Sequence, residues 1–487
     1  MTNIKRFASN TLILTISTIL TRVIDLFSII LIARHLGVPQ FGILSFAFAV
    51  NEILNIFADF GLNIYAAREI AREKGRLSQY FSNFVLLKTG ITFIILVMIT
   101  ILGSFTAISH QTKMITFILM ISMFFTSFRA FLNSIYQALQ KLAWIACGNI
   151  LYSGILLLGI IGVSYKDYGV NAFAILYLFS SITSFLILYT ILTRQCGLKL
   201  RISVFDRILC MKSLKDAWPL AGMALFVTIY FRVDTVMLSY MKGEEAVGIY
   251  SAAYRLSEAF LILPSMVLFA LFPILSDLHR NDPKLFQEAS EKTIKYLFIL
   301  ALPVTFVVIM NAQPLINFIY NNKFQESAHA LQILILAVGI MYITSALGNI
   351  IIVLNKQKVT FVMAILVTII NIGLNFLAIP KFSYLGAAAT TFATELIGLA
   401  IGLFNLSRWG CRINFRKNFM GPLVAFAFSL FISWGIFMLV PNIMLFTLAN
   451  LLIYAIFIYT WSLDQADKGI LEKTWHWNAL SWRKLCD

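Results

Sequence analysis

Charged side chains interrupt stretches of this sequence that are otherwise apolar. A charge at the centre of a lipid bilayer costs roughly 2.5–3.5 kcal/mol on insertion scales, so such groups must face each other or water. The cations are Arg22, Lys88, Arg129, Arg232 and Arg255, and the acids are Asp25, Glu52, Asp59, Asp234, Glu258 and Glu395. We expect the cations to contact a substrate in a polar cavity, and the acids to couple ion movement or to pair with the cations.

Helical spacing gathers these charges with hydroxyl and amide side chains on shared faces. At 100° per residue, polar residues fall on one stripe in each of five predicted helices. The stripes contain Thr11, Thr15, Thr18, Arg22 and Asp25; Ser45, Glu52, Asp59 and Asn63; Ser122, Thr126, Arg129, Asn133 and Gln137; Thr228, Arg232, Thr235 and Ser239; and Ser251, Arg255, Glu258 and Ser265. Such stripes are typical of helices that line a wet cavity.

A structural interpretation of the same charges stays open. Arg22 with Asp25 and Arg255 with Glu258 are spaced i,i+3, which suits ion pairs that only hold helices in register. Asp234 points away from Arg232 on its own helix, so its partner should lie on a neighbouring helix. Glu395 is interpreted as a structural pair, and Lys88 lies close enough to a helix end to snorkel to the membrane surface.

The composition predicts the class of molecule that must position these groups. Of 487 residues, 60% are hydrophobic and only 12% are charged, whereas soluble domains have roughly 45–50% apolar and about 25% charged residues. A soluble enzyme, a disordered chain and a nucleic-acid-binding module are therefore excluded. The length leaves room for roughly fourteen crossings of about 20 residues each, plus their connections.

Apolar runs of this length predict an all-α polytopic membrane protein rather than a β-barrel of short alternating strands. The predicted spans are residues 10–36, 41–65, 81–109, 113–139, 142–164, 168–193, 217–241, 246–272, 296–320, 327–354, 359–380, 384–407, 419–440 and 443–463. Residues 66–80 are predicted to form a short charged amphipathic helix on the membrane surface.

The placement of lysine and arginine predicts the orientation. Alternate loops and the helix ends beside them carry 27 of these residues on the side of the N-terminus and 6 on the opposite side. Positive residues accumulate in cytoplasmic loops. Both termini are therefore predicted in the cytoplasm, and the net charge of +16 becomes a topology signal instead of evidence for a nucleic-acid partner.

An internal repeat divides the chain. The segment Gly37-Val-Pro-Gln-Phe-Gly-Ile-Leu-Ser45 reappears as Gly243-Glu-Glu-Ala-Val-Gly-Ile-Tyr-Ser251, 206 residues later, and Glu52 reappears as Glu258. Six helices per copy give two lobes of parallel orientation with a substrate site between them. The predicted parts are an N-lobe at 1–194, a cytoplasmic linker at 195–216, a C-lobe at 217–408, two further helices at 409–463 and a Trp-rich tail at 464–487.

Signals for catalysis or metal binding are weak. The sequence contains no Walker-type loop, H-E-x-x-H or G-x-S-x-G motif. The five cysteines have no C-x-x-C spacing, which predicts free thiols without a disulfide framework. We predict that the protein is not an enzyme and binds no cofactor or metal beyond a coupling ion, H⁺ or Na⁺.

The last two predicted helices differ from the rest, because residues 419–463 contain no charged residue. Simple packing against the bundle explains this, and so does a groove for an acyl or polyprenyl chain. The tail 464–487 carries Trp475, Trp477 and Trp482 among basic residues, which is typical of a segment at the inner membrane interface. A partly disordered cytosolic tail is the alternative.

Three stretches of this sequence resemble a known family. Residues 31–62, 231–260 and 353–391 are similar to the Wzx-type flippases of lipid-linked oligosaccharides, members of the multidrug/oligosaccharidyl-lipid/polysaccharide exporter (MOP) superfamily. The resemblance covers residues 1 to about 410. It implies alternating access in a bacterial inner membrane, moving an undecaprenyl-diphosphate-linked sugar unit from the cytoplasmic to the periplasmic leaflet for O-antigen or other surface polysaccharide.

The resemblance assigns roles and leaves alternatives. Cavity cations bind the diphosphate in this family, and Arg22, Arg232 and Arg255 are the candidates here. Membrane lipids and a polysaccharide polymerase are implied partners. Many Wzx-type relatives are described with twelve helices, whereas fourteen are predicted here, so a lipid II substrate stays open. An ion-coupled small-molecule exporter, a glycan polymerase or ligase, and a structural scaffold are the other candidate functions.

Overall fold

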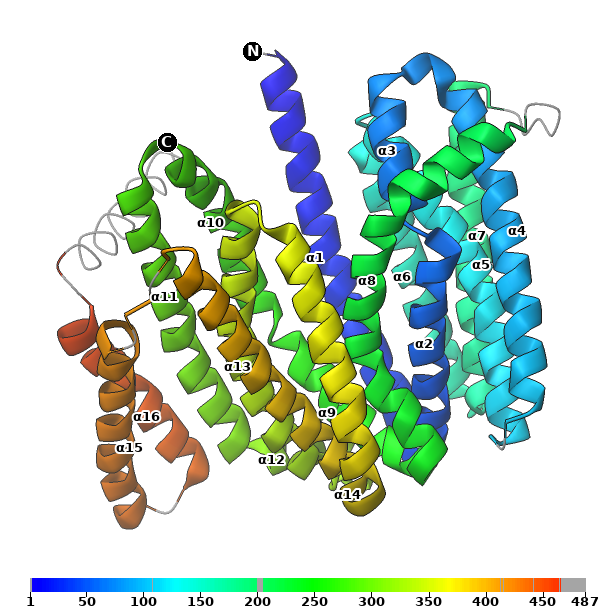
Figure 1. Ribbon diagram of the computed structural model, residues 1–487. Coiled ribbons are helices and arrows are strands. Elements are labelled where there is room, and N and C mark those ends of the chain that lie inside the picture. The colour runs from blue at the N-terminus through cyan, green and yellow to red at the C-terminus, as the bar shows by residue number, and fades with distance from the viewer. Residues whose placement is uncertain are drawn as a thin grey trace, which may run out of the picture. The chain divides into compact units, whose positions relative to one another are not determined.

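The computed structural model describes residues 2–106, 108–198, 205–411, 413–414, 416–440, 442–463 and 465. Within these residues every regular element is a helix (Figure 1). The predicted all-α class is therefore confirmed. The Trp-rich tail lies outside the described residues, apart from residue 465.

The helices overlap the predicted spans, but α8 and α11 begin well before theirs, and the spans 41–65, 246–272 and 296–320 are each divided between two helices. In the first part of the chain they are α1 (Thr2–Leu36), α2 (Val38–Asp59), α3 (Leu62–Arg72), η1 (Lys74–Arg76), α4 (Leu77–Ser104), α5 (His110–Ala138), α6 (Leu142–Tyr165) and α7 (Val170–Cys196). They continue with α8 (Arg207–Lys242), α9 (Glu244–Ala259), α10 (Ile262–Asn281), α11 (Pro283–Met310), α12 (Ala312–Tyr320), η3 (Asn322–Phe324), α13 (Ser327–Val353), α14 (Gln357–Arg408), η4 (Arg416–Met420), α15 (Gly421–Leu439), α16 (Ile443–Phe457) and η5 (Ile458–Ser462).

Thirteen helical stretches in the described residues are long and apolar enough to cross a membrane. One of them, α14, has 52 residues, which corresponds to ~78 Å at 1.5 Å per residue and is too long for one crossing. It breaks at Ser383, where φ is 52° and ψ is −133°. Both predicted spans 359–380 and 384–407 lie within it, so fourteen crossings fit the chain.

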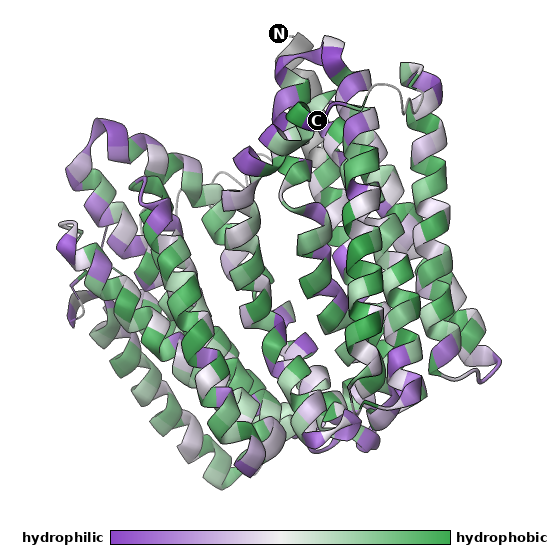
Figure 2. Ribbon diagram, turned by 45° about the vertical axis from the view of Figure 1, so that its right-hand side comes forward, coloured by the Kyte–Doolittle hydropathy of each residue, from purple (hydrophilic) through white to green (hydrophobic). Residues whose placement is uncertain are grey.

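Hydrophobic residues occupy the middle of most helices, and hydrophilic residues concentrate at the helix ends and in the connections (Figure 2). This distribution is the one that a membrane-spanning bundle requires, because backbone polar groups are satisfied inside each helix while the side chains face lipid. The protein is an all-α polytopic membrane protein.

The chain forms two compact units. The first contains Met1–Ala253, Ile316–Ser327 and Ala364–Thr390, and the second contains Tyr254–Leu315, Ala328–Met363 and Thr391–Asp487. The lobe and linker boundaries predicted from the repeat stay a prediction.

In the first unit, α1 packs along α6, α5 along α7, and α2 against both α5 and α8. Aromatic residues fill the space where α3, α4 and α5 meet, including Tyr65, Phe84 and Phe131. The buried Tyr136 of α5 donates a hydrogen bond from its hydroxyl to the Leu188 carbonyl of α7, at 3.0 Å. These helices form a rigid frame for the charged side chains they carry.

In the second unit, α15 and α16 form a hairpin that packs against α11. Asn450 of α16 donates from Nδ2 to the hydroxyls of Ser429 and Ser433 on α15, at 3.0 and 3.4 Å. The Lys295 ammonium of α11 donates to the Ser462 carbonyl at 2.6 Å. Neutral polar groups join the two charge-free helices to each other, which fits association within lipid.

The two repeat motifs share one backbone conformation. Gly37 has φ 75° and ψ 179°, and Gly243 has a φ of 86° and a ψ of −174°. Glycine adopts such positive φ values readily because it has no Cβ. Each glycine precedes the first residue of the next helix, α2 or α9, so the sequence repeat corresponds to a structural repeat.

The first turns of α2 and α9 cross at a second pair of glycines. A Cβ at Gly42 would lie 1.8 Å from the backbone oxygen of Glu244, and a Cβ at Gly248 would lie 2.1 Å from the backbone oxygen of Val38. Gly42 and Gly248 are repeat equivalents, as are Val38 and Glu244. The contact is therefore reciprocal, and it sets how closely these two helices approach.

Candidate functional site

Arg232 and Glu52 form an ion pair between α8 and α2. The Arg232 Nε donates to Oε2 of Glu52, and 13% of the arginine side chain is exposed against 40% of the glutamate side chain. Each residue was a candidate from the sequence, but nothing in the sequence paired them across 180 positions. The pair is charge-assisted, so it is a strong polar contact inside a spanning segment.

Lys88 of α4 pairs with the acid at the end of α2. Its ammonium donates to Asp59 at 2.8 Å and to the Asn63 side chain at 3.1 Å, and the lysine side chain is completely buried. The interpretation that Lys88 reaches out to the membrane surface is wrong. The lysine instead bridges a break between α2 and α3, where Phe60 and Gly61 both have positive φ.

Arg129 of α5 and Asp25 of α1 both contact α6. The guanidinium of Arg129 lies 4.3 Å from the centre of the Tyr152 ring and donates to Asn149 at 3.3 Å. The Ser153 hydroxyl donates to Asp25 at 2.8 Å. Residues Asn149, Tyr152 and Ser153 were missed in the sequence, although their i, i+3, i+4 spacing is a polar stripe that helical periodicity reveals.

Arg22 of α1 lies on an exposed polar stripe. Thr15, Thr18, Arg22 and Asp25 are all exposed, and a wet cavity along this face stays a prediction. An ion pair between Arg22 and Asp25 is absent from the residues that the structure describes, where Asp25 accepts from Ser153. The registry interpretation of this i,i+3 pair is therefore wrong for the described conformation.

Arg255 and Glu258 of α9 do form the predicted i,i+3 pair. Nη1 of Arg255 lies 3.6 Å from Oε2 of Glu258, and about a quarter of each side chain is exposed. Both residues lie on one helix, so this pair constrains no helix packing by itself.

Asp234 of α8 is buried, with partners on neighbouring helices as its direction predicted. The Tyr250 hydroxyl of α9 donates to Oδ2 at 2.8 Å, and Nδ2 of Asn375 of α14 donates to Oδ1 at 2.6 Å. Asn375 also donates to Asn371 at 3.0 Å. The two asparagines were missed, although amides four residues apart in the apolar span 359–380 were a detectable signal.

The contacts of Glu395 and the cysteines indicate structural roles. The Thr344 hydroxyl of α13 donates to Glu395 of α14 at 3.1 Å. Cys147, Cys196, Cys210 and Cys411 are free thiols, and burial raises the pKa of the Cys411 thiol to about 11. Cys486 lies outside the described residues. Among the described residues, no group of three or more His, Cys, Asp or Glu side chains is placed to hold a metal ion.

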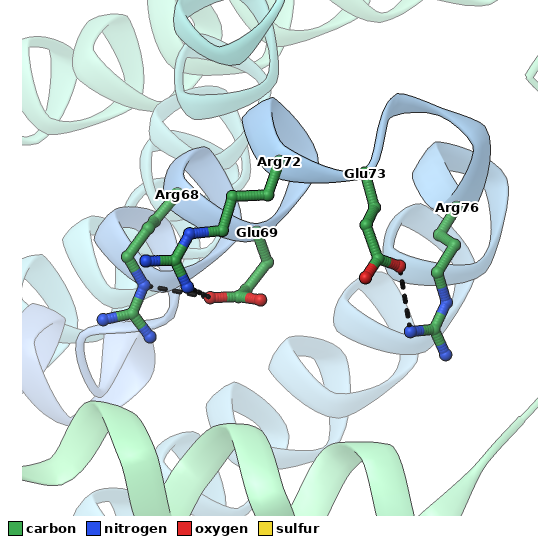
Figure 3. Close-up of polar contacts among 5 residues, drawn as sticks. All are labelled: Arg68, Glu69, Arg72, Glu73 and Arg76. Carbon is green, nitrogen blue, oxygen red and sulfur yellow. Dashed lines mark hydrogen bonds and ion pairs between the residues drawn. The ribbon is translucent and has the colours of Figure 1, made fainter.

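The charged side chains at the connection of α3, η1 and α4 differ from those inside the spanning helices. Glu69 pairs with Arg68 and Arg72, and Glu73 pairs with Arg76 (Figure 3). Most of these side chains are exposed, and exposed pairs contribute little to stability. The single short helix predicted at residues 66–80 is wrong in its bounds, because α3 ends at Arg72, η1 covers Lys74–Arg76 and α4 begins at Leu77. The buried face of α3 is formed by Leu62, Tyr65, Ala66 and Ile70.

Charged side chains inside spanning helices are rare and often mark substrate or ion pathways of membrane transporters. The chain matches the family model described as polysaccharide biosynthesis protein over residues 7–279, more than half its length, and it belongs to that family. A second model, MatE, matches residues 219–377.

Curated relatives agree with this assignment. The probable low-salt glycan biosynthesis flippase Agl15 of Haloferax volcanii is 21% identical over 80% of this chain and 81% of that protein. The capsular polysaccharide biosynthesis protein CapF of Staphylococcus aureus is 25% identical over 37% of this chain and 46% of that protein.

Solved structures share the fold. The lipid II flippase MurJ in an inward closed conformation superposes with a TM-score of 0.74 at 19% identity, covering 92% of this chain and 98% of that one. A multidrug resistance MATE family transporter of the MOP superfamily, in an inward-facing conformation, gives a TM-score of 0.66 at 16% identity, covering 80% and 95%. The predicted resemblance to the MOP superfamily is thus confirmed.

Proposed function

We propose that this protein is a flippase that moves an undecaprenyl-diphosphate-linked oligosaccharide across the membrane by alternating access. The observation that carries the proposal is the set of arginines inside spanning helices of a chain that belongs to the polysaccharide biosynthesis protein family. A diphosphate crossing a layer of about 30 Å of low dielectric needs compensating cations. Arginine supplies a planar fork that binds phosphate oxygens through two hydrogen bonds.

The substrate cations of this proposal are Arg22, Arg232 and Arg255, with Arg129 and Lys88 as further candidates. Their environments favour the first three, because Lys88 is completely buried against Asp59 and Arg129 is engaged by the Tyr152 ring. Arg22 is exposed on α1, which makes it the most accessible of the five.

The orientation of the chain is proposed from the charge asymmetry of the loops, because 27 basic residues on one side against 6 on the other favour cytoplasmic termini. Movement from the cytoplasmic to the periplasmic leaflet of a bacterial inner membrane is proposed from the resemblance to the Wzx-type flippases. The product then serves O-antigen or another surface polysaccharide, with polymerase machinery as a partner.

Coupling to H⁺ or Na⁺ is proposed for the acids Asp25, Glu52, Asp59, Asp234 and Glu258. Asp234 supports this best, because its carboxylate is buried and accepts hydrogen bonds from the Tyr250 hydroxyl and the Asn375 amide. Such surroundings suit a carboxylate that gains and loses a cation during a cycle.

The α15–α16 hairpin is proposed to contact the polyprenyl chain. Its sequence is free of charge between residues 419 and 463, and large apolar side chains such as Phe431, Leu439 and Leu452 are exposed. A polyprenyl chain and the lipid acyl chains are both apolar, so such a surface can pack against either of them.

Reconstitution into vesicles with fluorescent undecaprenyl-diphosphate-linked oligosaccharide tests the function. We expect leaflet exchange that depends on the protein and is lost when Arg22, Arg232 and Arg255 are changed together to glutamine. A lipid II arm in the same assay separates the two flippase substrates. Exchange equal to that of empty vesicles would contradict the proposal.

A MATE-like exporter of small molecules is the second candidate, favoured by the MatE match over residues 219–377. It predicts ion-driven efflux of a soluble cationic drug from the same vesicles, with no exchange of lipid-linked oligosaccharide.

A further inference from the structure

The first turns of α8 extend beyond the length of helix that a membrane crossing needs. The helix has 36 residues, or ~54 Å at 1.5 Å per residue, whereas the hydrocarbon layer is about 30 Å thick. The part of α8 that is apolar enough to cross is Ala221–Lys242. Pro219 lies inside the helix, and proline bends helices. The turns before it, residues 207–218, run at an angle to the rest of α8 (Figure 1).

One face of these turns is anchored within the first unit. Leu209 and Ala217 are buried in the cluster that joins α3, α4 and α5. The backbone N–H of Asp206 donates to the Asn83 side chain of α4 at 2.6 Å. A Cβ at Gly61 would lie 2.8 Å from the backbone oxygen of Ala217, so the backbones also approach closely. These contacts fix which face of residues 207–218 points outward.

The outward face carries large apolar and basic side chains together. Ile208, Met211 and Trp218 are 81%, 59% and 53% exposed, and Lys212 and Lys215 are also exposed. At 100° per residue, the three apolar residues and Lys215 lie within about 80° of each other. The exposed face therefore mixes two kinds of side chain that neither water nor hydrocarbon accommodates well.

The headgroup layer of a membrane accommodates both kinds. Apolar side chains on a surface helix reach the acyl chains, tryptophan is enriched at this level, and basic side chains bind lipid phosphates. Arg207 is a third exposed cation, and Asp216 is the exposed acid of residues 207–218, so three cations and one acid give this face a charge of +2. A positive charge favours anionic over zwitterionic lipid.

We infer that the outward face of residues 207–218 is a binding site for the headgroups of anionic phospholipids. Three basic side chains contact the lipid phosphates: Arg207, Lys212 and Lys215. The exposed apolar side chains beside them lie among the acyl chains. The inference needs a chain that spans a membrane, and it is independent of which substrate the protein transports.

Another helix that begins before its predicted span lacks this combination. Over residues 283–295 of α11, Leu285 is the one large apolar side chain that is exposed. Lys284 and Glu288 are both exposed and lie four residues apart, so their opposite charges share one face. Such a surface suits water, and the features of a lipid site belong to the first turns of α8.

Lipid binding to the purified full-length protein in uncharged detergent micelles tests the inference, with native mass spectrometry counting the bound lipids. The probes are anionic phosphatidylglycerol and zwitterionic phosphatidylcholine with the same acyl chains. We expect the wild type to prefer phosphatidylglycerol. The triple variant Arg207→Gln, Lys212→Gln and Lys215→Gln should lose at least about fivefold of that preference, the contribution of one basic side chain at an anionic surface.

A matched control removes the same charge from exposed lysines elsewhere. Lys242→Gln, Lys323→Gln and Lys381→Gln together should leave the preference within about twofold, because distant exposed charges are screened. A fall as large as that of the first triple variant would mean that net charge governs lipid binding, which contradicts the inference. If the first triple variant is recovered unfolded, Lys212→Gln with Lys215→Gln replaces it.

A second variant tests the apolar half of the site. Ile208→Ser with Met211→Ser should weaken the binding of both lipids while the preference for phosphatidylglycerol remains. Unchanged binding of both lipids would overturn the placement of these side chains among the acyl chains.

The remaining outcomes decide between a lipid and a protein occupant. Equal binding of the two lipids by the wild type, or an equal preference in the wild type and the first triple variant, overturns the inference. A second copy of this chain is the competing occupant. A wild-type dimer that both the triple and the apolar variants convert to a monomer, with no preference for phosphatidylglycerol, assigns this face to an interface between copies and also overturns the inference.

Discussion

Two glutamates at equivalent positions of the internal repeat have different kinds of partner. Glu52 of α2 pairs with Arg232, which belongs to another helix, whereas Glu258 of α9 pairs with Arg255, three residues earlier on its own helix. The glycines that begin and cross these helices are the same in both copies. The repeat thus preserves backbone geometry, while these two ion pairs join two helices in the first copy and residues of one helix in the second.

Burial explains why the first copy lacks a local partner. The repeat equivalent of Arg255 is Ala49, which is 2% exposed. A guanidinium at that position would be surrounded by packed side chains, and close-packed interiors tolerate added volume poorly. The acid in the first copy must therefore take its cation from a neighbouring helix, which ties α2 to α8.

The breaks that follow α2 and α9 show the same contrast. At the first break, the ammonium of Lys88 bridges Asp59 and Asn63. At the second break, the hydroxyl of Tyr342 donates to the Phe260 carbonyl at 2.8 Å. A charged contact thus bridges the break after α2 and a neutral hydrogen bond bridges the break after α9, so removing the two contacts should have unequal effects.

The largest loss of stability is expected at the glycine crossing of α2 and α9, where the two copies of the repeat are alike. Gly42→Ala places a Cβ 1.8 Å from the Glu244 backbone oxygen, which forces the helices apart and should lower the free energy of unfolding by more than about 3 kcal/mol. Gly248→Ala should match it. Thermal unfolding in detergent measures both, with Gly90→Ala as the control because no atom lies within 4 Å of a Cβ there. If only one of the two glycine variants lost stability, the two halves of the crossing would contribute unequally to the free energy of unfolding.

The next effect concerns the break in the first copy. Lys88→Ala leaves the Asp59 carboxylate without its buried cation and should destabilise the protein by about 3 kcal/mol, the lower end for a broken buried pair, because 23% of the Asp59 side chain is exposed. Adding Asp59→Asn should restore part of this loss. The same unfolding assay measures the variants. Wild-type stability in Lys88→Ala would mean that the pair does not hold the break.

A smaller effect is expected at the break in the second copy. Tyr342→Phe removes one neutral hydrogen bond to the Phe260 carbonyl and should lower the free energy of unfolding by about 1 kcal/mol. Measuring Tyr342→Phe and Lys88→Ala in one experiment compares how much a neutral and a charged contact across a helix break contribute to the free energy of unfolding. Equal losses would remove the contrast between the two copies.

The smallest effect on stability is expected at the local pair. Arg255→Ala removes an i,i+3 contact between partly exposed side chains on one helix, and we expect a smaller loss of stability than in Lys88→Ala, whose cation is completely buried. If Arg255 binds substrate, transport should fall while the melting temperature stays nearly unchanged. Full transport in Arg255→Ala, and in the double variant with Glu258→Gln, would remove Arg255 from the substrate site.

Much of the fold could be predicted from the sequence because it depends on local patterns. Apolar runs of spanning length gave the positions of the spanning helices, including the pair joined in α14, although α8 and α11 begin well before their predicted spans. The repeated glycine motif identified α2 and α9 as equivalents before their shared φ values were known. Helical periodicity also put Thr15, Thr18, Arg22 and Asp25 on one face of α1, and all four are exposed in the structure.

Partners on different helices could not be predicted. Periodicity gives the face on which Glu52, Lys88 or Asp234 lies, but the residue opposite depends on how each helix is rotated and how closely its neighbour approaches. In this protein a backbone contact at Gly42 and Gly248 and the breaks after Asp59 and Ala259 set those distances. The tertiary structure therefore decided that Arg232 pairs with Glu52, that Lys88 is buried against Asp59, and that the adjacent charges Arg22 and Asp25 form no ion pair among the described residues.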